Sequence, residues 1–60
     1  MYKEYDVVIA NKALSENIKC GYLGTILICY DDSFYEVEFL NEFDEFVGIM
    51  TVSEGDLNKA

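Results

Sequence analysis

Apolar and acidic residues alternate from Tyr35 to Phe39, within the segment 34–40, and this pattern limits the fold more than any other feature of this chain. Successive side chains of a β-strand point to opposite faces of the sheet, so this pattern predicts a strand with one buried apolar face and one solvated acidic face. Polar turn residues bound the segment on both sides. The apolar positions are Tyr35, Val37 and Phe39, and the acidic positions are Glu36 and Glu38.

Three further segments are rich in β-branched and apolar residues and predict strands at 5–10, 25–30 and 46–52. Residues 25–30 are apolar on both faces, which indicates a strand that is covered on both sides or whose outer face meets a partner. Gly48 lies inside the last of these segments and indicates a bulge or a tight bend.

The remaining segments predict loops and short helical turns. Residues 11–19 break the strand pattern, and we expect a long excursion there with one helical turn, anchored by Leu14 and Ile18. Ser53 is a typical N-cap residue, so a second helical turn is expected to follow it. Residues 58–60 are expected to fray.

Few folds place four or five strands in 60 residues without a long helix. We therefore expect an all-β chain that forms a small SH3-like antiparallel barrel, with one or two short helical turns, as a single domain over residues 1–60. The alternative is an open meander that dimerises through its uncovered face. A chain of this length buries only about 60% of the surface that its unfolded form exposes, so a homodimer is one way to stabilise it.

The two cysteines, Cys20 and Cys29, are expected to stay reduced, as buried free cysteines commonly do in cytosolic proteins. The first residues lack the basic start and apolar run of a secretory signal. No apolar stretch approaches the roughly 18 residues of a transmembrane helix. These features together predict a cytoplasmic protein.

The charge of the chain is strongly one-sided. It has four lysines, no arginine or histidine, and a formal net charge of -8. Such a chain repels phosphate backbones and anionic headgroups, so the charge argues against binding to nucleic acid or to a membrane and favours a basic protein partner. Seven of the twelve carboxylates lie between positions 31 and 45, at Asp31, Asp32, Glu36, Glu38, Glu42, Asp44 and Glu45.

Several blocks occur in a fixed order: YKEYDVV at 2–8, GYLGTI at 21–26, YEVEF at 35–39, TV at 51–52 and DL at 56–57. In these blocks the chain resembles a family of short bacterial proteins of uncharacterised function. The resemblance covers nearly the whole chain and implies an SH3-like barrel, similar to ribosomal KOW-type domains, without catalytic residues. Leu23 departs from the more polar residues of relatives. We interpret it, with Leu27, Cys29 and Met50, as part of a partner or dimer surface.

Glu36 and Glu38 are two positions apart on one strand, so their side chains share a face about 7 Å apart. That spacing suits an acid and base pair, or, with Asp31 or Asp32, a hard-cation site. No histidine, arginine or nucleophile constellation accompanies it, so we expect no enzyme, no metal and no cofactor. The simplest interpretation is a solvated face that protects the strand from aggregation.

We predict a non-enzymatic acidic binding protein, an immunity or antitoxin-type inhibitor that neutralises a basic bacterial toxin, of which a nuclease is one example. The alternative is a dimeric accessory module that docks onto a larger protein without inhibiting it. Aromatic residues beside the acids are expected to act as anchors within an acidic rim. The predicted contact residues are Asp31, Asp32, Glu36, Glu38, Asp44, Glu45, Phe43 and Phe34.

Overall fold

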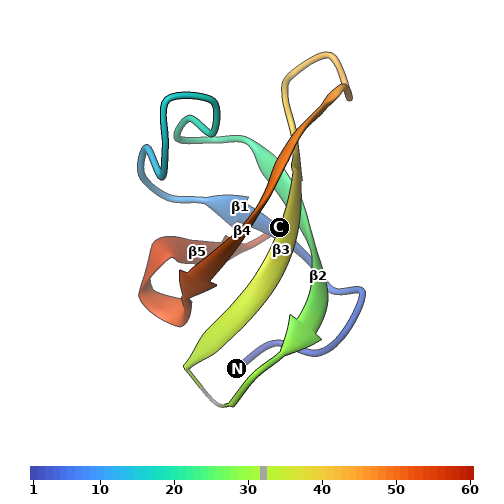
Figure 1. The fold of residues 1–60 in the computed structure, drawn as a ribbon, viewed down its shortest axis with the longest axis vertical. Helices are drawn as coiled ribbons and strands as arrows, with labels where there is room; N and C mark the ends of the chain where they lie inside the picture. Colours follow the sequence, from blue (N-terminus) through green and yellow to red (C-terminus); the bar gives the residue numbers. More distant parts are fainter. Residues whose placement is uncertain (32) are drawn as a thin grey trace.

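A computed structural model describes residues 1–31 and 33–60, so the predicted contact residue Asp32 lies outside the described residues. Five antiparallel strands form one sheet in the order β4-β3-β2-β1-β5, which curls into a half-barrel (Figure 1). The all-β antiparallel fold class is therefore confirmed. The elements are β1 (Val7–Ala10), β2 (Leu23–Cys29), β3 (Phe34–Leu40), β4 (Phe46–Ser53), the 3₁₀ turn η1 (Glu54–Asp56) and β5 (Leu57–Lys59).

The strand predicted from the alternating pattern, at 34–40, is confirmed at both ends. The first strand begins later than predicted because Tyr5 has a left-handed backbone (φ 70°) and turns the chain before β1. The predicted N-cap is also confirmed, since Ser53 has an extended backbone at the start of η1 and its amide donates to an Asp56 carboxylate oxygen at 3.1 Å.

Two predictions about irregular segments are wrong. Residues 11–19 contain no helical turn, because the Ser15 hydroxyl accepts the amides of Asn17 and Ile18 and folds the loop back on itself. Residues 58–60 do not fray, because β5 pairs with the free edge of β1 and the Ala60 amide donates to Val7.

Two irregularities in pairing help to curl the sheet. The register shifts between Ile26 and Ile28 on β2, and again on β4, where Gly48 lies opposite Phe39 and Phe46 lies opposite Leu40. The second shift confirms the bulge predicted from Gly48.

Inside the curl, side chains from all five strands and the β1–β2 loop form the core. Gly24 of β2 allows β3 to approach closely, since a Cβ there would lie 2.5 Å from a methyl carbon of Val37. Leu14 packs against the core and Ile18 belongs to it, which confirms both as anchors. The buried core residues are Val8, Ala10, Ile18, Ile26, Tyr35, Val37, Phe39, Val52 and Leu57.

The N-terminal residues lie against the inner side of the half-barrel. The rings of Tyr2 and Tyr35 pack edge to face with centroids 5.5 Å apart, and the Tyr2 amide donates to the Tyr35 hydroxyl. That hydroxyl donates in turn to Glu54, whose other oxygen pairs with the Met1 ammonium at 2.6 Å. Desolvation is the main reason that the pKa of Tyr35 is raised.

Both cysteines are free and exposed, so the prediction that they are buried is wrong. The Cys29 thiol lies 3.5 Å from the Tyr2 carbonyl oxygen. Within the described part of the chain, no helix has the length and apolar character needed to cross a membrane.

Candidate functional site

The outer face of the sheet carries the side chains that alternate with the core residues. Pairing places Thr51 of β4 beside Glu36 and Ile49 beside Glu38, while on the other side β2 contributes Ile28 and Thr25. We call this surface the outer face. Its members, taken from the strand registers, are Val7, Leu23, Thr25, Ile28, Phe34, Glu36, Glu38, Phe46, Ile49 and Thr51.

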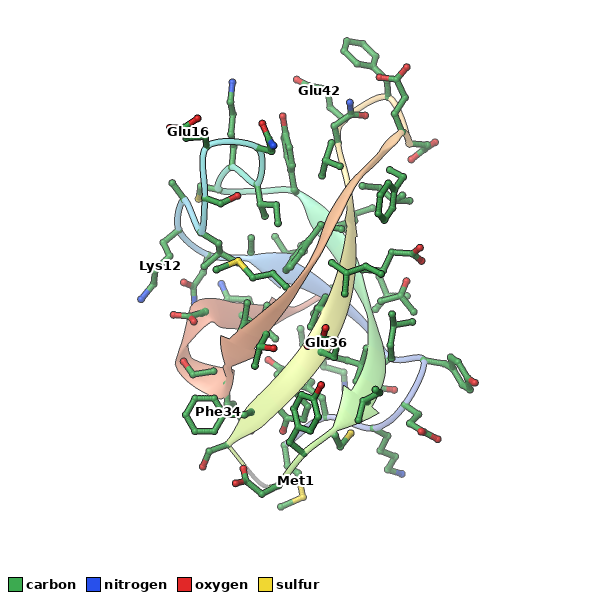
Figure 2. All side chains as sticks on the ribbon, viewed as in Figure 1. Met1, Lys12, Glu16, Phe34, Glu36 and Glu42 are labelled. Carbon is green, nitrogen blue, oxygen red and sulfur yellow. The ribbon has the colours of Figure 1, made fainter. Side chains whose placement is uncertain are left out.

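Glu36 is held in place at the middle of this face (Figure 2). The Thr51 hydroxyl donates to one of its carboxylate oxygens at 2.6 Å, and the Tyr30 hydroxyl donates to the same oxygen at 3.3 Å. Desolvation, followed by the charge of Glu36, raises the pKa of Tyr30. The carboxylate is therefore oriented by β4 and by the residue that follows β2 before any partner arrives.

The carboxylates of the outer face are not neutralised by the protein itself. Across the described residues, the ion pairs join the Met1 ammonium to Glu54 and Lys12 to Asp56. Neither pair involves Glu36 or Glu38. The negative charge of this face is consequently available to a cationic partner.

Large apolar side chains surround the two glutamates. Phe46 is 60% exposed and Ile49 is 50% exposed on β4, while Val7 is 49% exposed on β1. Leu23 and Ile28 of β2 are also exposed. Contiguous exposed apolar side chains beside charged ones are typical of protein interaction surfaces. The outer face therefore has central charges among apolar residues, whereas the sequence predicted central apolar anchors with a charged rim.

The residues predicted for partner binding do not form one cluster. Glu36, Glu38 and Phe34 share the outer side of β3. Asp31 lies in the β2–β3 turn, and residues 43–45 lie in the β3–β4 turn, at opposite ends of a molecule 29 Å long (Figure 1). Figure 2 shows the same separation between Phe34 near one end, Glu36 in the middle and Glu42 at the other end.

The two turns use part of their acidic and polar side chains for their own folding. Asp31 accepts the amides of Ser33 and Phe34, at 2.8 and 3.2 Å, and so shapes the turn before β3. In the other turn, the Asn41 side chain accepts the amides of Phe43 and Glu45. That turn leaves Phe43 74% exposed beside Asp44 and Glu45.

The proposed grouping of Leu27, Cys29 and Met50 in one dimer surface is wrong. Met50 packs against the core, and the Cys29 thiol faces the Tyr2 carbonyl on the inner side. Leu27 is half-buried at the β2 bulge. The three side chains therefore do not form a common exposed patch.

Sequence reasoning missed most of the apolar part of the outer face. The one available signal was the run of β2, which is apolar on both faces and does contribute the exposed Leu23 and Ile28. For Val7, Phe46 and Ile49 the sequence showed only generic strand residues. Their assembly on the same face as Glu36 and Glu38 depends on strand register.

Within the described residues, no group of three or more acidic or cysteine side chains is placed to hold a metal ion, and no pocket opens at the surface. What this face offers chemically is a broad contact surface with oriented carboxylates.

Fold and surface define a small all-β domain with an acidic and apolar outer face. The chain belongs to the DUF4926 family, a domain of unknown function whose family model matches residues 4–59. Comparison with curated proteins and with solved structures finds no significant match.

Proposed function

We propose that this protein is a non-enzymatic binding protein of the immunity or antitoxin type, which neutralises a basic bacterial toxin through the outer face. The observation that carries the proposal is the pair Glu36 and Glu38, which no lysine of the described chain neutralises and which exposed apolar side chains surround. Charge would steer a cationic partner to this face, and the apolar side chains would slow its dissociation.

A toxin that acts on nucleic acid is one target with suitable chemistry. The surface of a nuclease must attract phosphates, so it carries lysine and arginine side chains that carboxylates of an inhibitor can bind in their place. Thr51 and Tyr30 hold Glu36 in one orientation, which lowers the cost of ordering this side chain in a complex. We propose a cytoplasmic location in a bacterium, where such a toxin would have to be neutralised.

The fold-level part of the proposal is a relationship to SH3-like barrels of the KOW type. The support is the strand order β4-β3-β2-β1-β5 and the 3₁₀ turn that joins β4 to β5, together with the blocks of sequence resemblance. In KOW-type nucleic-acid binding a positive groove would be needed, and the charge of -8 disfavours it here.

The test is recovery of the tagged protein from its native lysate at low salt, followed by elution with rising salt. A basic protein that elutes with salt is then purified and assayed for toxicity and nuclease activity with and without this protein. The proposal requires that the activity is inhibited at about one-to-one stoichiometry.

Two double variants separate the outer face from net charge. Glu36→Lys with Glu38→Lys should abolish inhibition, whereas Glu4→Lys with Glu16→Lys changes the net charge equally at exposed sites elsewhere and should preserve it. Equal effects of the two variants would mean that only net charge matters. Unchanged inhibition by the first variant would exclude the outer face as the contact.

The second candidate function is an accessory module that docks onto a larger protein without inhibiting it, and the exposed apolar side chains of the outer face favour it. Docking of that kind should depend weakly on salt, because burial of apolar area dominates it. A partner that stays bound at high salt and keeps its activity would support this alternative.

A further inference from the structure

The two edges of the sheet are protected very differently. The β5 edge is three residues long and carries Lys59. The β4 edge is eight residues long, pairs only with β3 among the described strands, and contains no charged residue and no proline. Short length, lysine and proline are the usual devices that keep an edge strand from pairing with another chain. The β4 edge lacks all three, and its bulge, which is a further device of this kind, lies at residue 47, before the segment 49–53.

We propose that the β4 edge pairs antiparallel with β4 of a second copy of this chain, so that one sheet runs through both copies. This inference does not rest on the proposed toxin, because it concerns the backbone edge of β4, although the side chains of Ile49 and Thr51 also belong to the outer face. It assigns an interaction surface to a strand that contributes no carboxylate.

The hydrogen-bond pattern identifies which backbone groups are available. The Glu54 amide donates to the Ser33 carbonyl at 2.8 Å, and bonded residues alternate along an antiparallel ladder. Counting back from Glu54 along β4, the backbone groups of Ser53, Thr51 and Ile49 face away from β3. The Ser53 amide is already bonded to Asp56 at 3.1 Å. Ile49 and Thr51 thus provide the donors and acceptors of the free edge.

These groups select one register. In a two-fold pairing centred on Met50, Ile49 of each copy lies opposite Thr51 of the other, and the two residues exchange amide and carbonyl bonds. A pairing centred on Thr51 would place Ile49 opposite Ser53, whose amide is occupied. A pairing centred on Ile49 would place Thr51 opposite the bulge at residue 47. The centre at Met50 avoids both conflicts.

The absence of charged residues on β4 favours an equally uncharged strand over a cationic one at this edge. A cationic strand would find no carboxylate on β4 to pair with, whereas β4 of a second copy is equally uncharged. Glu36 and Glu38 lie one strand inside, so the acidic rows of two paired copies would be three strand spacings apart, about 14 Å. That separation exceeds the Debye length of about 8 Å at physiological salt. Contact between two outer faces would instead bring the glutamates together.

Cross-linking tests the register directly. With Cys20 and Cys29 replaced by serine, Met50→Cys should form a disulfide-linked dimer on mild oxidation, because the facing Cα atoms would be about 4.5 Å apart. Ile49→Cys is the matched control. Its copies would lie diagonally, about 8 Å apart, and should not cross-link. A reversed pattern, or cross-linking of neither variant, would overturn the proposal.

Sedimentation equilibrium of the unmodified chain tests association without relying on cysteine chemistry. We expect a monomer–dimer equilibrium that tightens as salt rises, because salt screens the repulsion between two chains of charge -8. Ile49→Lys should weaken the dimer at least tenfold, whereas Leu23→Lys, an equally large change on the interior strand β2, should not. A monomer at all salt concentrations, or equal effects of the two lysines, would exclude the β4 edge. Toxin binding should weaken as salt rises, whereas the dimer should tighten. The failure of one proposal can therefore be distinguished from the failure of the other.

Discussion

The inner and outer faces of β3 alternate along the same seven residues but have opposite physical properties. The inner side chains of Tyr35, Val37 and Phe39 are fully buried against the other strands. The outer side chains, such as Glu36 and Glu38, remain accessible and carry unneutralised charge. One face therefore contributes most to folding and the other offers a contact surface. Substitutions on the two faces should separate stability from binding.

The largest difference between the faces is expected for truncated aromatic side chains. Phe39→Ala should lower the free energy of unfolding by about 3–5 kcal/mol, because it opens a cavity at a fully buried site. Phe46→Ala, at a residue 60% exposed on the outer face, should cost less than about 1 kcal/mol. Urea unfolding followed by circular dichroism measures both. Similar losses would mean that the outer face is also part of the core.

A smaller effect is expected from filling the space between β2 and β3. Gly24→Ala places a methyl group 2.5 Å from Val37 and 2.8 Å from Phe39, so the strands must move apart, at about 1–3 kcal/mol. Gly55→Ala is the matched control, since its nearest contact is 3.9 Å away. It should leave the urea midpoint nearly unchanged. If Gly24→Ala were as well tolerated, the close approach of the strands would not be needed.

A modest pH effect is expected at the end of β4. The hydrogen bond from the Ser53 amide, followed by Lys12, lowers the pKa of Asp56. The stabilisation is present above the unfolded pKa of about 4 and is lost as pH falls through the lower folded value. Urea unfolding between about pH 5 and 2 should therefore show a smaller decline for Asp56→Asn than for the unmodified chain. Equal slopes would show that this contact does not affect stability.

The smallest effect on stability is expected for Glu38→Gln, which keeps the shape of the side chain and removes its charge. The free energy of unfolding should change by less than about 0.5 kcal/mol. The association rate with a basic partner should fall, and most at low salt. Stopped-flow measurements at two salt concentrations test this result. An unchanged rate would place the steering charge elsewhere on the chain.

Local sequence patterns predicted the elements whose conformation depends on nearby residues. The strand at 34–40 followed from a period of two, the N-cap from the hydroxyl of Ser53, and the bulge from Gly48. The helical turn predicted within residues 11–19 was wrong, because the Ser15 hydroxyl competes for the backbone amides there, and composition does not reveal this competition. The predicted fraying of residues 58–60 was wrong, because the tail is ordered by pairing with β1, about fifty residues earlier in the chain.

The candidate site shows the same division between local and long-range information. Sequence identified Glu36 and Glu38 as neighbours on one face, because that relation depends only on their spacing within one strand. It also grouped Asp31 with Asp44 and Glu45, which lie at opposite ends of the hairpin. Proximity in sequence does not imply proximity in space once a strand of seven residues separates two turns.

By itself, the sequence determined a small acidic all-β chain, its central strand, and which side of that strand is charged, since composition and a period of two need no tertiary information. Only the tertiary structure decided that Val7, Phe46 and Ile49 join the two glutamates, that Thr51 orients Glu36, and that β4 has a free edge. Register and strand order decide these relations, because they set which residues meet across strands, and they arise from contacts between segments far apart in the chain.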